Sequence, residues 1–426
     1  MDRADGPRST RDGCEGWLVA NPLGGRFRRA LGLAAIAPRS VRCRNAFTHL
    51  PFIIPTLRSA GSAHARALPQ EVDRPPRAGD RLYLIGDVHG EIDALRTLLD
   101  RLGVDVARSR AERPLVFVGD LVDRGPDSVA VVELYAKLAA AGLAFAVLGN
   151  HELNVLMDAK KTGNGWFFGE QDTFKLGSAT HPFPSRLATP VEQASVRATL
   201  AELPLVLERS DLRVVHAMWD AEAAETLPPK GDWAALAAQI ERKIKARLKA
   251  EGWSTRAKAE AKPYANLRDP GIHPPAFLPA SAEVDEARQR DNPIKLLTSG
   301  AERKLDGSLP FYTGGRWRFV DRVQWWAEVG VDRPTVIGHY WRLREVEHRG
   351  HGGETRAEPW DHARPFAWQN DVFCVDYSAG RRYEERVARA EPLANGAPFH
   401  GRLAALRWPE RTLVFDDGVT IATTAS

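Results

Sequence analysis

The alternation of short apolar runs and amphipathic segments between residues 81 and 149 constrains the fold of this chain more than any other feature. Three apolar runs of the length of buried strands each end in a glycine: "RLYLIG" (81–86), "PLVFVG" (114–119) and "LAFAVLG" (143–149). Two segments between them carry apolar residues at helical spacing: "EIDALRTLLDRLG" (91–103) and the Ala-rich stretch 127–141. This order predicts a βαβαβ unit with adjacent parallel strands, in an α/β core that begins near Asp80.

Polar side chains follow each of these strands, in "GDVHG", "GDLVDRG" and "GNHE". Two later apolar runs, "LRVVH" and "PTVIGH", also end in a histidine. Because ligands of an open parallel sheet lie at the carboxyl ends of its strands, these groups are expected to converge. The candidate metal ligands are Asp87, His89, Asp120, Asn150, His216 and His339.

Carboxylate, imidazole and amide oxygen ligands suit divalent ions such as Mn, Fe or Zn. Six ligands exceed the needs of one tetrahedral ion with an open position, but they suit two ions that share one carboxylate. Such a pair binds a phosphoryl group and generates a bridging hydroxide. Each motif alone is typical of a turn or a helix cap. Their joint occurrence at strand ends, with spacings of 33 residues from Asp87 to Asp120 and 30 from Asp120 to Asn150, favours the metal hypothesis.

The amino-acid composition indicates a globular protein and argues against several other classes. The chain has 426 residues, of which 43% are hydrophobic and 27% charged, as in globular proteins. No run approaches 18 apolar residues, so no membrane span is expected. Cys14, Cys43 and Cys374 are scattered, which indicates a reducing compartment and a cytoplasmic location. There is no GxxxxGK[ST] or GxGxxG motif for a nucleotide or dinucleotide fold.

The pI of about 9.0 comes from the N-terminal segment. Residues 1–77 contain 13 Arg, no Lys and six acidic residues, a net charge of +7, whereas the whole chain carries +4. No nucleic-acid partner is therefore expected for the rest of the chain. We expect residues 1–78 to be a basic extension, either disordered or an overlong translated start, or else targeting-like because "GRFRRALGLAAIAPRS" (25–40) pairs basic and apolar residues.

"GDVHG", "GDLVDRG" and "GNHE", in this order and spacing, resemble the signature of the calcineurin-like metallophosphoesterases. More narrowly, they resemble the branch that holds the phosphoprotein phosphatases and the bacterial diadenosine tetraphosphatases. The resemblance is strong over residues 80–160 and weaker through "VVHA", "VIGHYW", "FCVDYSAG" and "GRLAALRW" to about residue 416. It implies an α/β fold: a four-layer metallophosphoesterase sandwich of two central mixed β-sheets flanked by helices. Late strands at 371–376, 401–408 and 412–416 would complete the second sheet.

The resemblance also implies roles for individual residues. Asp87 and His89 would bind the first ion, Asp120 would bridge both ions, and Asn150, His216 and His339 would bind the second. Manganese is favoured, and Fe or Zn also fits. His151 would be the general acid and Asp123 would orient it, since an imidazole near a carboxylate stays cationic near neutral pH. Arg124 would hold the phosphate oxygens.

The chain departs from this branch beside both distal histidines, in "HAMWD" and "GHYW". Burial of the side chains and recognition of a base or leaving group are both open for Met218, Trp219, Tyr340 and Trp341. A second phosphate-binding arginine has no firm counterpart. Arg316 or Arg318 is a candidate, with an ordinary surface arginine as the alternative.

We expect one catalytic domain over residues 79–416, with a helical insertion at about 220–317 and a tail at 417–426. In and after the insertion, 231–252 is predicted to be a helix with a solvated basic face, 263–281 a Pro-rich loop, and 318–331 a crossover helix. An insertion beside the crevice could act as a lid. His348 and His351 are expected in a surface loop.

The leading functional hypothesis is two-metal hydrolysis of phosphate monoesters, of the phosphoprotein phosphatase type. The alternative is hydrolysis of dinucleoside polyphosphates, which "GRLAALRW" favours. The expected partner is thus a phosphorylated substrate, either phosphoprotein or nucleotide. A third hypothesis is a metal-binding protein without catalytic activity. A missing metal ligand or a missing general acid would indicate such a protein.

Overall fold

The computed structural model describes residues 79–269, 271–272, 275–306, 309–313, 315–344, 371–388 and 399–423. The expected N-terminal extension, residues 1–78, and the loop with His348 and His351 lie outside these residues. Within the described part, no helix is both long and apolar enough to cross a membrane.

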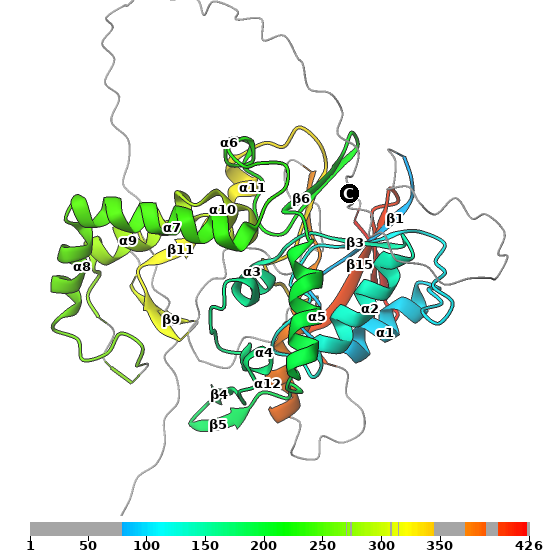
Figure 1. Ribbon diagram of the computed structural model, residues 1–426, viewed down its shortest axis with the longest axis horizontal. Coiled ribbons are helices and arrows are strands. Elements are labelled where there is room, and N and C mark those ends of the chain that lie inside the picture. The colour runs from blue at the N-terminus through cyan, green and yellow to red at the C-terminus, as the bar shows by residue number, and fades with distance from the viewer. Residues whose placement is uncertain are drawn as a thin grey trace, which may run out of the picture. The chain divides into compact units, whose positions relative to one another are not determined.

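The larger of two central sheets contains the predicted βαβαβ unit. Its order is β17-β16-β15-β1-β2-β3, with β14 also paired to β15. Its strands are β1 (Leu82–Ile85), β2 (Leu115–Phe117), β3 (Ala144–Ala146), β14 (Asp376–Tyr377), β15 (Arg402–Trp408), β16 (Thr412–Phe415) and β17 (Thr420–Ala422). Strands β1, β2 and β3 are parallel and β15 is antiparallel to β1. The crossover helices are α1 (Ile92–Arg101) and α2 (Ser128–Ala140), coloured blue to cyan in Figure 1.

The smaller sheet has the order β13-β12-β7-β6. Its strands are β6 (Val206–Arg209), β7 (Leu212–Val215), β12 (Thr335–Ile337) and β13 (Val372–Cys374). Strand β12 is parallel to both β7 and β13, whereas β6 is antiparallel to β7. Both sheets are therefore mixed, as expected.

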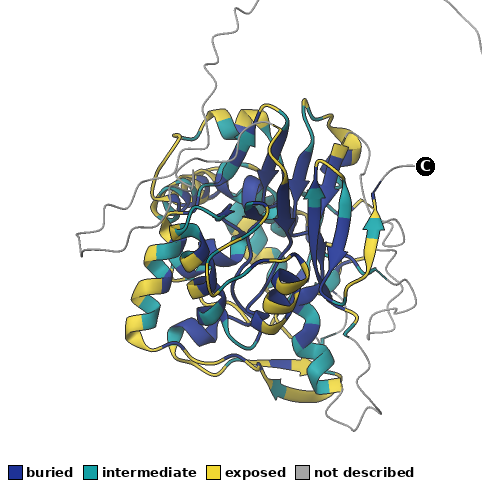
Figure 2. Ribbon diagram, turned by 90° about the vertical axis from the view of Figure 1, so that its right-hand side faces the viewer, coloured by how far each residue is buried: buried dark blue, intermediate teal, exposed yellow. Residues whose placement is uncertain are grey.

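The two sheets pack against each other through one apolar cluster. Leu84 and Val116 of the larger sheet share this cluster with Val214, Val336 and Phe373 of the smaller one. Successive residues of a strand point to opposite faces, so the alternate residues face the flanking helices. Figure 2 shows the buried central strands between helices whose outer faces are exposed. The fold is the predicted α/β sandwich of two mixed sheets flanked by helices.

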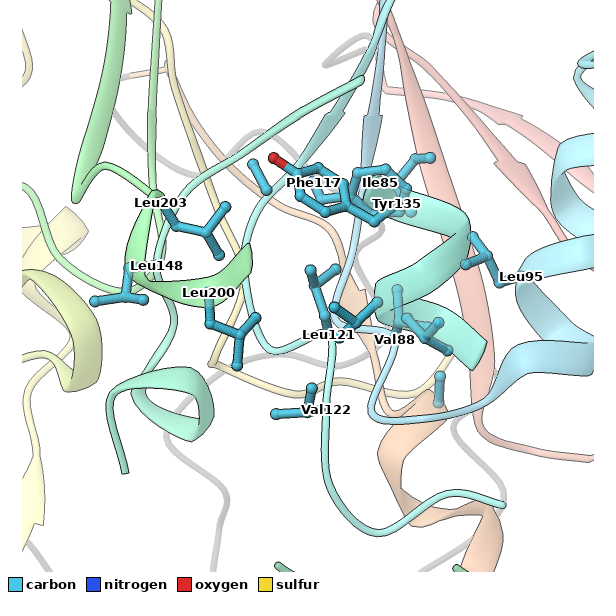
Figure 3. Packing of buried hydrophobic residues seen from close by; sticks show 14 of the residues in the cluster. Ile85, Val88, Leu95, Phe117, Leu121, Val122, Tyr135, Leu148, Leu200 and Leu203 are labelled. Carbon is cyan, nitrogen blue, oxygen red and sulfur yellow. The ribbon is translucent and has the colours of Figure 1, made fainter. Parts of the chain in front are cut away.

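The core between the larger sheet and its helices is shown in Figure 3. Phe117 of β2 is fully buried, and its ring meets Tyr135 of α2 edge-on, with the ring centroids 5.8 Å apart. Leu95 of α1 and Leu200 of α5 (Pro190–Ala201) join the same cluster. Each such side chain contributes roughly 1.5–3 kcal/mol to the free energy of unfolding. This core fixes the strand ends that carry the candidate ligands.

Short elements surround those strand ends. They are α3 (Asn150–Leu156), α4 (Gly165–Phe168), the hairpin of β4 (Thr173–Leu176) and β5 (Ala179–Pro182), a 3-10 helix at Ala379–Arg381, and α12 (Arg382–Ala388). Phe174 and Phe183 beside the hairpin pack on Tyr383 of α12, with ring centroids 4.6 Å apart in both pairs.

The insertion contains both helices and strands. Its helices are α6 (Ala221–Glu225), α7 (Trp233–Ala250), α8 (Trp253–Ala261), α9 (Pro279–Arg290) and α10 (Pro293–Ser299). Strands β8 (Glu302–Lys304) and β9 (Phe311–Thr313) follow, and each forms an antiparallel pair with a later strand, β8 with β11 (Val320–Arg322) and β9 with β10 (Arg316–Arg318). The helix predicted at 231–252 is α7, and the insertion lies beside α3 in Figure 1.

Three local predictions were wrong. The late strands β15 and β16 do not complete the second sheet, because β15 pairs with β1 and β16 pairs with β15 in the larger sheet. The stretch 318–331 is not a crossover helix, because β11 pairs with β8 and only α11 (Trp325–Glu328) is helical. Phe319 and Val320 are buried against Leu278 and Ala282, and this packing overrides the helical pattern. The stretch expected to be a tail, 417–426, contains β17, which pairs with β16 and extends the larger sheet.

Candidate metal centre

The structure brings all six predicted ligands to one place. Five follow directly from the carboxyl ends of strands β1, β2, β7 and β12, and the sixth, Asn150, is the first residue of α3. Two groups of three side chains could each hold a metal ion, because within each group the ligand atoms lie within 4.8 Å of one another. The first group is His89, Asp120 and His151, and the second is Asp120, His216 and His339. Every member of the two groups is buried. Asp120 belongs to both, as the sequence predicts for a shared ligand.

The distal group is compact. Asn150 Oδ1 lies 3.2 Å from His216 Nε2 and 2.9 Å from His339 Nδ1. Asp120 Oδ2 lies 3.2 Å from the same His216 nitrogen. Ligands that share one ion at about 2.1 Å lie roughly 3 Å apart. The separations in this group therefore fit a common ion.

Asp87 provides an independent sign that a cation fits here. Its Oδ2 accepts a hydrogen bond from the backbone N–H of His339 at 3.0 Å. Its Oδ1 is buried and has no hydrogen-bond partner among the described residues. A Cβ atom at Gly338 would lie 1.9 Å from this oxygen, so only glycine leaves it room. A buried carboxylate oxygen without a partner is costly unless a cation or donor meets it.

Backbone carbonyls orient two of the imidazoles. His216 Nδ1 lies 2.8 Å from the carbonyl oxygen of Val118, and His89 Nδ1 lies 3.1 Å from that of Val122. A carbonyl oxygen only accepts, so Nδ1 carries the proton in both rings. When the rings are neutral, their Nε2 lone pairs are directed at the cluster, as in metal-binding histidines.

The acids of the cluster have strongly shifted pKa values. Burial, followed by the negative charge of Asp376, holds the pKa of Asp87 well above its usual range. Burial also acts to raise the pKa of Asp120, but His216, His151 and His89 outweigh it and hold that pKa well below the usual range. Asp120 therefore stays ionised as a shared anionic ligand.

The pKa values of the histidines shift in opposite directions, depending on the charges of the neighbouring groups. Burial acts to lower the pKa of His216, but the charge of Asp120 outweighs it and raises the pKa to about 10. Burial holds the pKa of His89 and His339 well below the ordinary value, and the positive charges of Arg124 and Arg322 respectively add to this effect. Neutral imidazoles keep the lone pair that a metal ion requires.

Five residues of the site have a left-handed backbone. The φ angles are +48° at both His89 and Asp120, +78° at Asp123, +70° at Arg124 and +62° at His339. Each such residue costs on the order of 1–3 kcal/mol, which the surrounding fold must supply. Strain of this kind clusters at functional sites, so it supports an active role for this region.

Asp123 and His151 form the predicted pair. Asp123 Oδ2 lies 2.6 Å from His151 Nδ1, and Trp166 Nε1 donates to Asp123 Oδ1 at 2.7 Å. Because the carboxylate accepts, it fixes the imidazole with Nε2 facing the cluster, where Nε2 lies 3.9 Å from Asp120 Oδ2. Trp166 is fully buried and holds the carboxylate in turn.

Arg124 also faces the cluster. Its Nη2 lies 3.1 Å from His151 Nε2, and its Nη1 lies 3.4 Å from His89 Nε2. A planar guanidinium in this position presents several donors to an anion held between the two imidazoles.

Glu152 holds the loop that carries Asp120, a role that the sequence analysis missed. Its carboxylate accepts backbone hydrogen bonds from Asp120 at 2.8 Å, Leu121 at 2.7 Å, Val122 at 3.3 Å and Gly149 at 3.0 Å. Burial and then the charge of Asp120 raise its pKa to about 7. The available signal was its place three residues after the cap of a helix, in "GNHE".

Comparison with known proteins identifies the first part of this site. Residues 80–205 match the model of the calcineurin-like phosphoesterase family. The match includes Asp87, His89, Asp120 and Asn150, whereas His216 and His339 lie beyond it and are brought to the candidate metal centre by the smaller sheet.

Curated relatives match over limited segments. The chain is 45% identical over 93 residues to a symmetrical bis(5'-nucleosyl)-tetraphosphatase of Dechloromonas aromatica, covering 22% of this chain and 31% of the relative. It is 32% identical over 145 residues to the asymmetrical bis(5'-nucleosyl)-tetraphosphatase PrpE of Oceanobacillus iheyensis, covering 32% and 55%. The chain thus spans about half the length, or less, of these relatives.

A solved structure of a cold-active protein-tyrosine phosphatase from a Shewanella species covers 81% of this chain and 80% of its own, at 14% identity and a TM-score of 0.37.

The two candidates for a second phosphate-binding arginine are held in ion pairs, which favours the alternative of an ordinary arginine for both. Arg316 pairs with Asp285 at 3.2 Å, and Arg318 pairs with Glu302. Arg322 instead reaches the site, where its Nη1 lies 3.4 Å from the carbonyl oxygen of His339. Neither spacing nor composition distinguishes Arg322 in the sequence. Only the β8–β11 pairing brings it to the metal centre.

The aromatic residues beside the distal histidines have different environments. Met218 and Tyr340 are buried, which favours the packing interpretation for both. Trp219 is partly buried, and the guanidinium of Arg213 stacks 3.6 Å from its ring centroid. Trp341 is partly exposed, and the guanidinium of Arg381 lies 5.2 Å from its ring centroid. Of the four, Trp341 remains a candidate for contact with a substrate.

Proposed function

We propose that this protein is a metal-dependent phosphoesterase that hydrolyses dinucleoside polyphosphates. The single observation that carries the phosphoesterase part is the convergence of six ligand-type side chains with Asp123, Arg124 and His151. The substrate class is supported by the curated relatives, whose names are bis(5'-nucleosyl)-tetraphosphatases. They favour the alternative of the sequence analysis over its leading hypothesis of phosphoprotein hydrolysis.

The proposed metal ligands divide into two sets that share Asp120. Asp87 and His89 would hold one ion with it, and Asn150, His216 and His339 would hold the other. When bound, two such ions supply Lewis acidity toward the phosphoryl oxygens and lower the pKa of water. The donor set fits Mn, Fe or Zn.

Arg124 and His151 would act directly on the substrate. The guanidinium of Arg124 would bind phosphate oxygens, and Arg322 is the proposed second cation on the opposite side, beside His339. His151 would give the proton on Nε2 to the leaving oxygen. Asp123, which accepts from Nδ1 at 2.6 Å, would keep that ring oriented.

We further infer that residues 79–416 and β17 form one catalytic domain. The insertion at about 220–317 would lie over the substrate side of the site, because Ala217, next to His216, donates to Leu297 of α10 at 2.9 Å. This contact supports the inference, because it joins an insertion helix to the neighbour of His216, a proposed metal ligand.

A substrate panel tests the proposed function. Purified full-length protein with Mn²⁺ is assayed on diadenosine tetraphosphate, an aryl phosphate and a phosphopeptide. We expect the highest kcat/KM on diadenosine tetraphosphate. Efficient hydrolysis of the phosphopeptide without cleavage of the dinucleotide would restore the monoesterase hypothesis.

A further inference from the structure

Asp123, the partner of the proposed general acid, is held by hydrogen bonds at both of its carboxylate oxygens. Oδ2 accepts from His151 Nδ1 at 2.6 Å, and Oδ1 accepts from the indole Nε1 of Trp166 at 2.7 Å. The backbone N–H of Asp123 donates to Ser128 Oγ at 2.9 Å, which fixes the main chain but not the torsion about Cβ–Cγ. Asp123 is fully buried, so the two side-chain donors set the rotation of the carboxylate.

Trp166 is itself anchored, because the short helix α4 is fixed by other parts of the chain. Asp172 Oδ2 accepts the backbone N–H groups of Gly163 at 2.9 Å and Gly165 at 2.7 Å, at the start of α4. The carbonyl oxygen of Trp166 accepts the N–H of Ala188 at 2.9 Å. The Trp166 side chain lies in the main apolar core. These contacts hold the indole in place with its N–H directed at Asp123.

The loop between α3 and α4 also holds Arg124. The carbonyl oxygen of Gly163 accepts the backbone N–H of Arg124 at 3.0 Å. A Cβ atom at Gly163 would lie 3.2 Å from Arg124 Cγ, so the loop also lies against the side chain. This segment therefore reaches both residues that would act directly on the substrate. It contacts Arg124 itself, and it reaches His151 through Trp166 and Asp123.

Proton donation to a leaving oxygen requires one orientation of the His151 ring. When the ester P–O bond breaks, the leaving oxygen keeps the electron pair of that bond and takes the proton from Nε2, whose N–H electron pair stays on the nitrogen. Nδ1–H stays hydrogen bonded to Asp123, and no proton moves at Trp166. Small misplacements of a reacting group lower the rate strongly.

We propose that Trp166 is a positioning residue that orients His151 by fixing the carboxylate of Asp123. This inference rests on the proposed function, because His151 acts as an acid only if phosphoesters are cleaved here. It adds a residue outside the two proposed metal sets and outside the Asp123–His151 pair. A carboxylate with only one remaining donor could rotate about Cβ–Cγ and carry the imidazole with it.

Trp166→Phe tests the inference, because phenylalanine keeps an aromatic ring and lacks the N–H. The matched control is Trp233→Phe, since Trp233 of α7 is also buried and donates its Nε1 to the carbonyl oxygen of Leu203 at 3.1 Å. The full-length variants are assayed with Mn²⁺ on a series of aryl phosphates. We expect Trp166→Phe to lower kcat roughly tenfold for phenols of the highest pKa and much less for those of the lowest. KM and metal content should not change, and Trp233→Phe should leave kcat unaltered.

A double-mutant cycle separates positioning from a general loss of structure. In the His151→Asn background, Trp166→Phe should change kcat by less than about twofold, because the ring that Trp166 positions is gone. A second variant replaces Trp166 by 3-(3-benzothienyl)alanine, which has a sulfur atom in place of the indole N–H and nearly the same shape. It should reproduce the kinetic effect, and it serves as the test if Trp166→Phe does not fold.

A spectroscopic measurement reports the orientation of the ring without turnover. In the full-length protein with Zn²⁺, which is diamagnetic, Nδ1–H of His151 should give a far-downfield proton resonance that exchanges slowly with water. Its absence from His151→Asn identifies it. Trp166→Phe should shift this resonance and speed its exchange, because local opening exposes the proton to water. Trp233→Phe should leave it unchanged.

The inference would be overturned if Trp166→Phe lowered kcat equally for all phenols, or if its effect persisted in the His151→Asn background. An unchanged His151 resonance in Trp166→Phe would also overturn it. Absence of phosphoesterase activity in wild type would contradict the proposed function instead, and the resonance would still decide whether Trp166 orients the ring.

Discussion

At the scale of single residues, the site combines strained backbones with buried groups that hold them in place. Asp120 has a φ of +48°, and its loop is held by the carboxylate of Glu152 through four backbone hydrogen bonds to that loop and Gly149. A conformation that costs free energy by itself persists only when its surroundings over-determine it. Glu152 therefore positions a shared ligand without belonging to the ligand set.

Glu152→Gln is expected to weaken metal binding. One amide oxygen cannot replace two carboxylate oxygens, and the amide N–H groups would face backbone donors, at a cost of about 1–3 kcal/mol. Displacement of Asp120 should lower metal affinity by roughly 10- to 100-fold. Metal titration measures this, with the exposed Glu202→Gln as control. Unchanged affinity in Glu152→Gln would show that the loop keeps its shape without the carboxylate.

His151→Asn is expected to lower kcat by about 100- to 10,000-fold, the range for loss of a general acid. The loss should be greatest for leaving groups of high pKa, which need the proton most. Metal content should change little, since all six proposed metal ligands remain. Metal analysis and kinetics on a series of aryl phosphates measure both, with His181→Asn of the β4–β5 hairpin as control. Loss of metal from His151→Asn would identify His151 as a ligand.

At the scale of elements, local pattern and tertiary packing disagree in the insertion. The helix α7 was predicted, but its buried face includes Glu241 as well as the apolar residues of the sequence pattern. Lys295 and Arg288, from α10 and α9, hold this carboxylate. Likewise, 318–331 has a helical pattern but forms β11, since the partner strand β8 and the apolar cluster around Trp317 are available only in the folded molecule. The periodicity of apolar residues predicts a helix or strand reliably only where the packing against neighbouring elements favours the same secondary structure.

Glu241→Gln is expected to destabilise the protein in a pH-dependent manner. Burial raises the pKa of Glu241, but Lys295 and Arg288 outweigh it and bring the pKa from its ordinary 4.5 to about 2. The ion pairs thus add stability above pH 4.5, roughly 2 kcal/mol, which is lost as the pH falls toward 2. Thermal melting should show a lower Tm for the variant at pH 7 and a shrinking difference below pH 4.5.

Glu251→Gln is the matched control, because Glu251 lies exposed at the end of the same helix and pairs with Arg247 at 3.7 Å on the surface. Such pairs add little stability. A difference between wild type and Glu241→Gln that did not depend on pH would contradict the ion-pair explanation.

At the scale of the whole molecule, the candidate metal centre draws its side chains from both sheets. Asp87, His89 and Asp120 come from the larger sheet, whereas His216 and His339 come from the smaller one. The chain passes from one sheet to the other close to this site: a Cβ atom at Gly86, directly after β1, would lie 2.1 Å from the carbonyl oxygen of Val375, which links β13 of the smaller sheet to β14 of the larger one. Bound ions would therefore stabilise the packing of the entire sandwich.

Removal of metal is expected to lower the Tm of the full-length protein. A ligand that binds only the folded state stabilises it by about 2.7 kcal/mol at a concentration 100 times its Kd. Chelation should lower Tm by several degrees, and Mn²⁺ should restore it in proportion to the logarithm of its concentration. Asp120→Asn is the control and should lack the Mn²⁺ response. A wild-type Tm that is indifferent to chelation and Mn²⁺ would contradict a metal link between the sheets.

The sequence by itself determined the βαβαβ core and the identity of the six candidate ligands. Strand ends are local features, since a buried apolar run that ends in glycine and polar residues is visible without any knowledge of the fold. Asp123, Arg124 and His151 could be named in advance because "GDLVDRG" and "GNHE" resemble the signature of the calcineurin-like metallophosphoesterases.

The tertiary structure alone decided which other groups meet this core. Glu152, Asp376 and Arg322 act on the site through contacts that no local pattern encodes. Charges interact through space and strands pair with distant partners. Groups gathered in this way become evident only when the chain is folded.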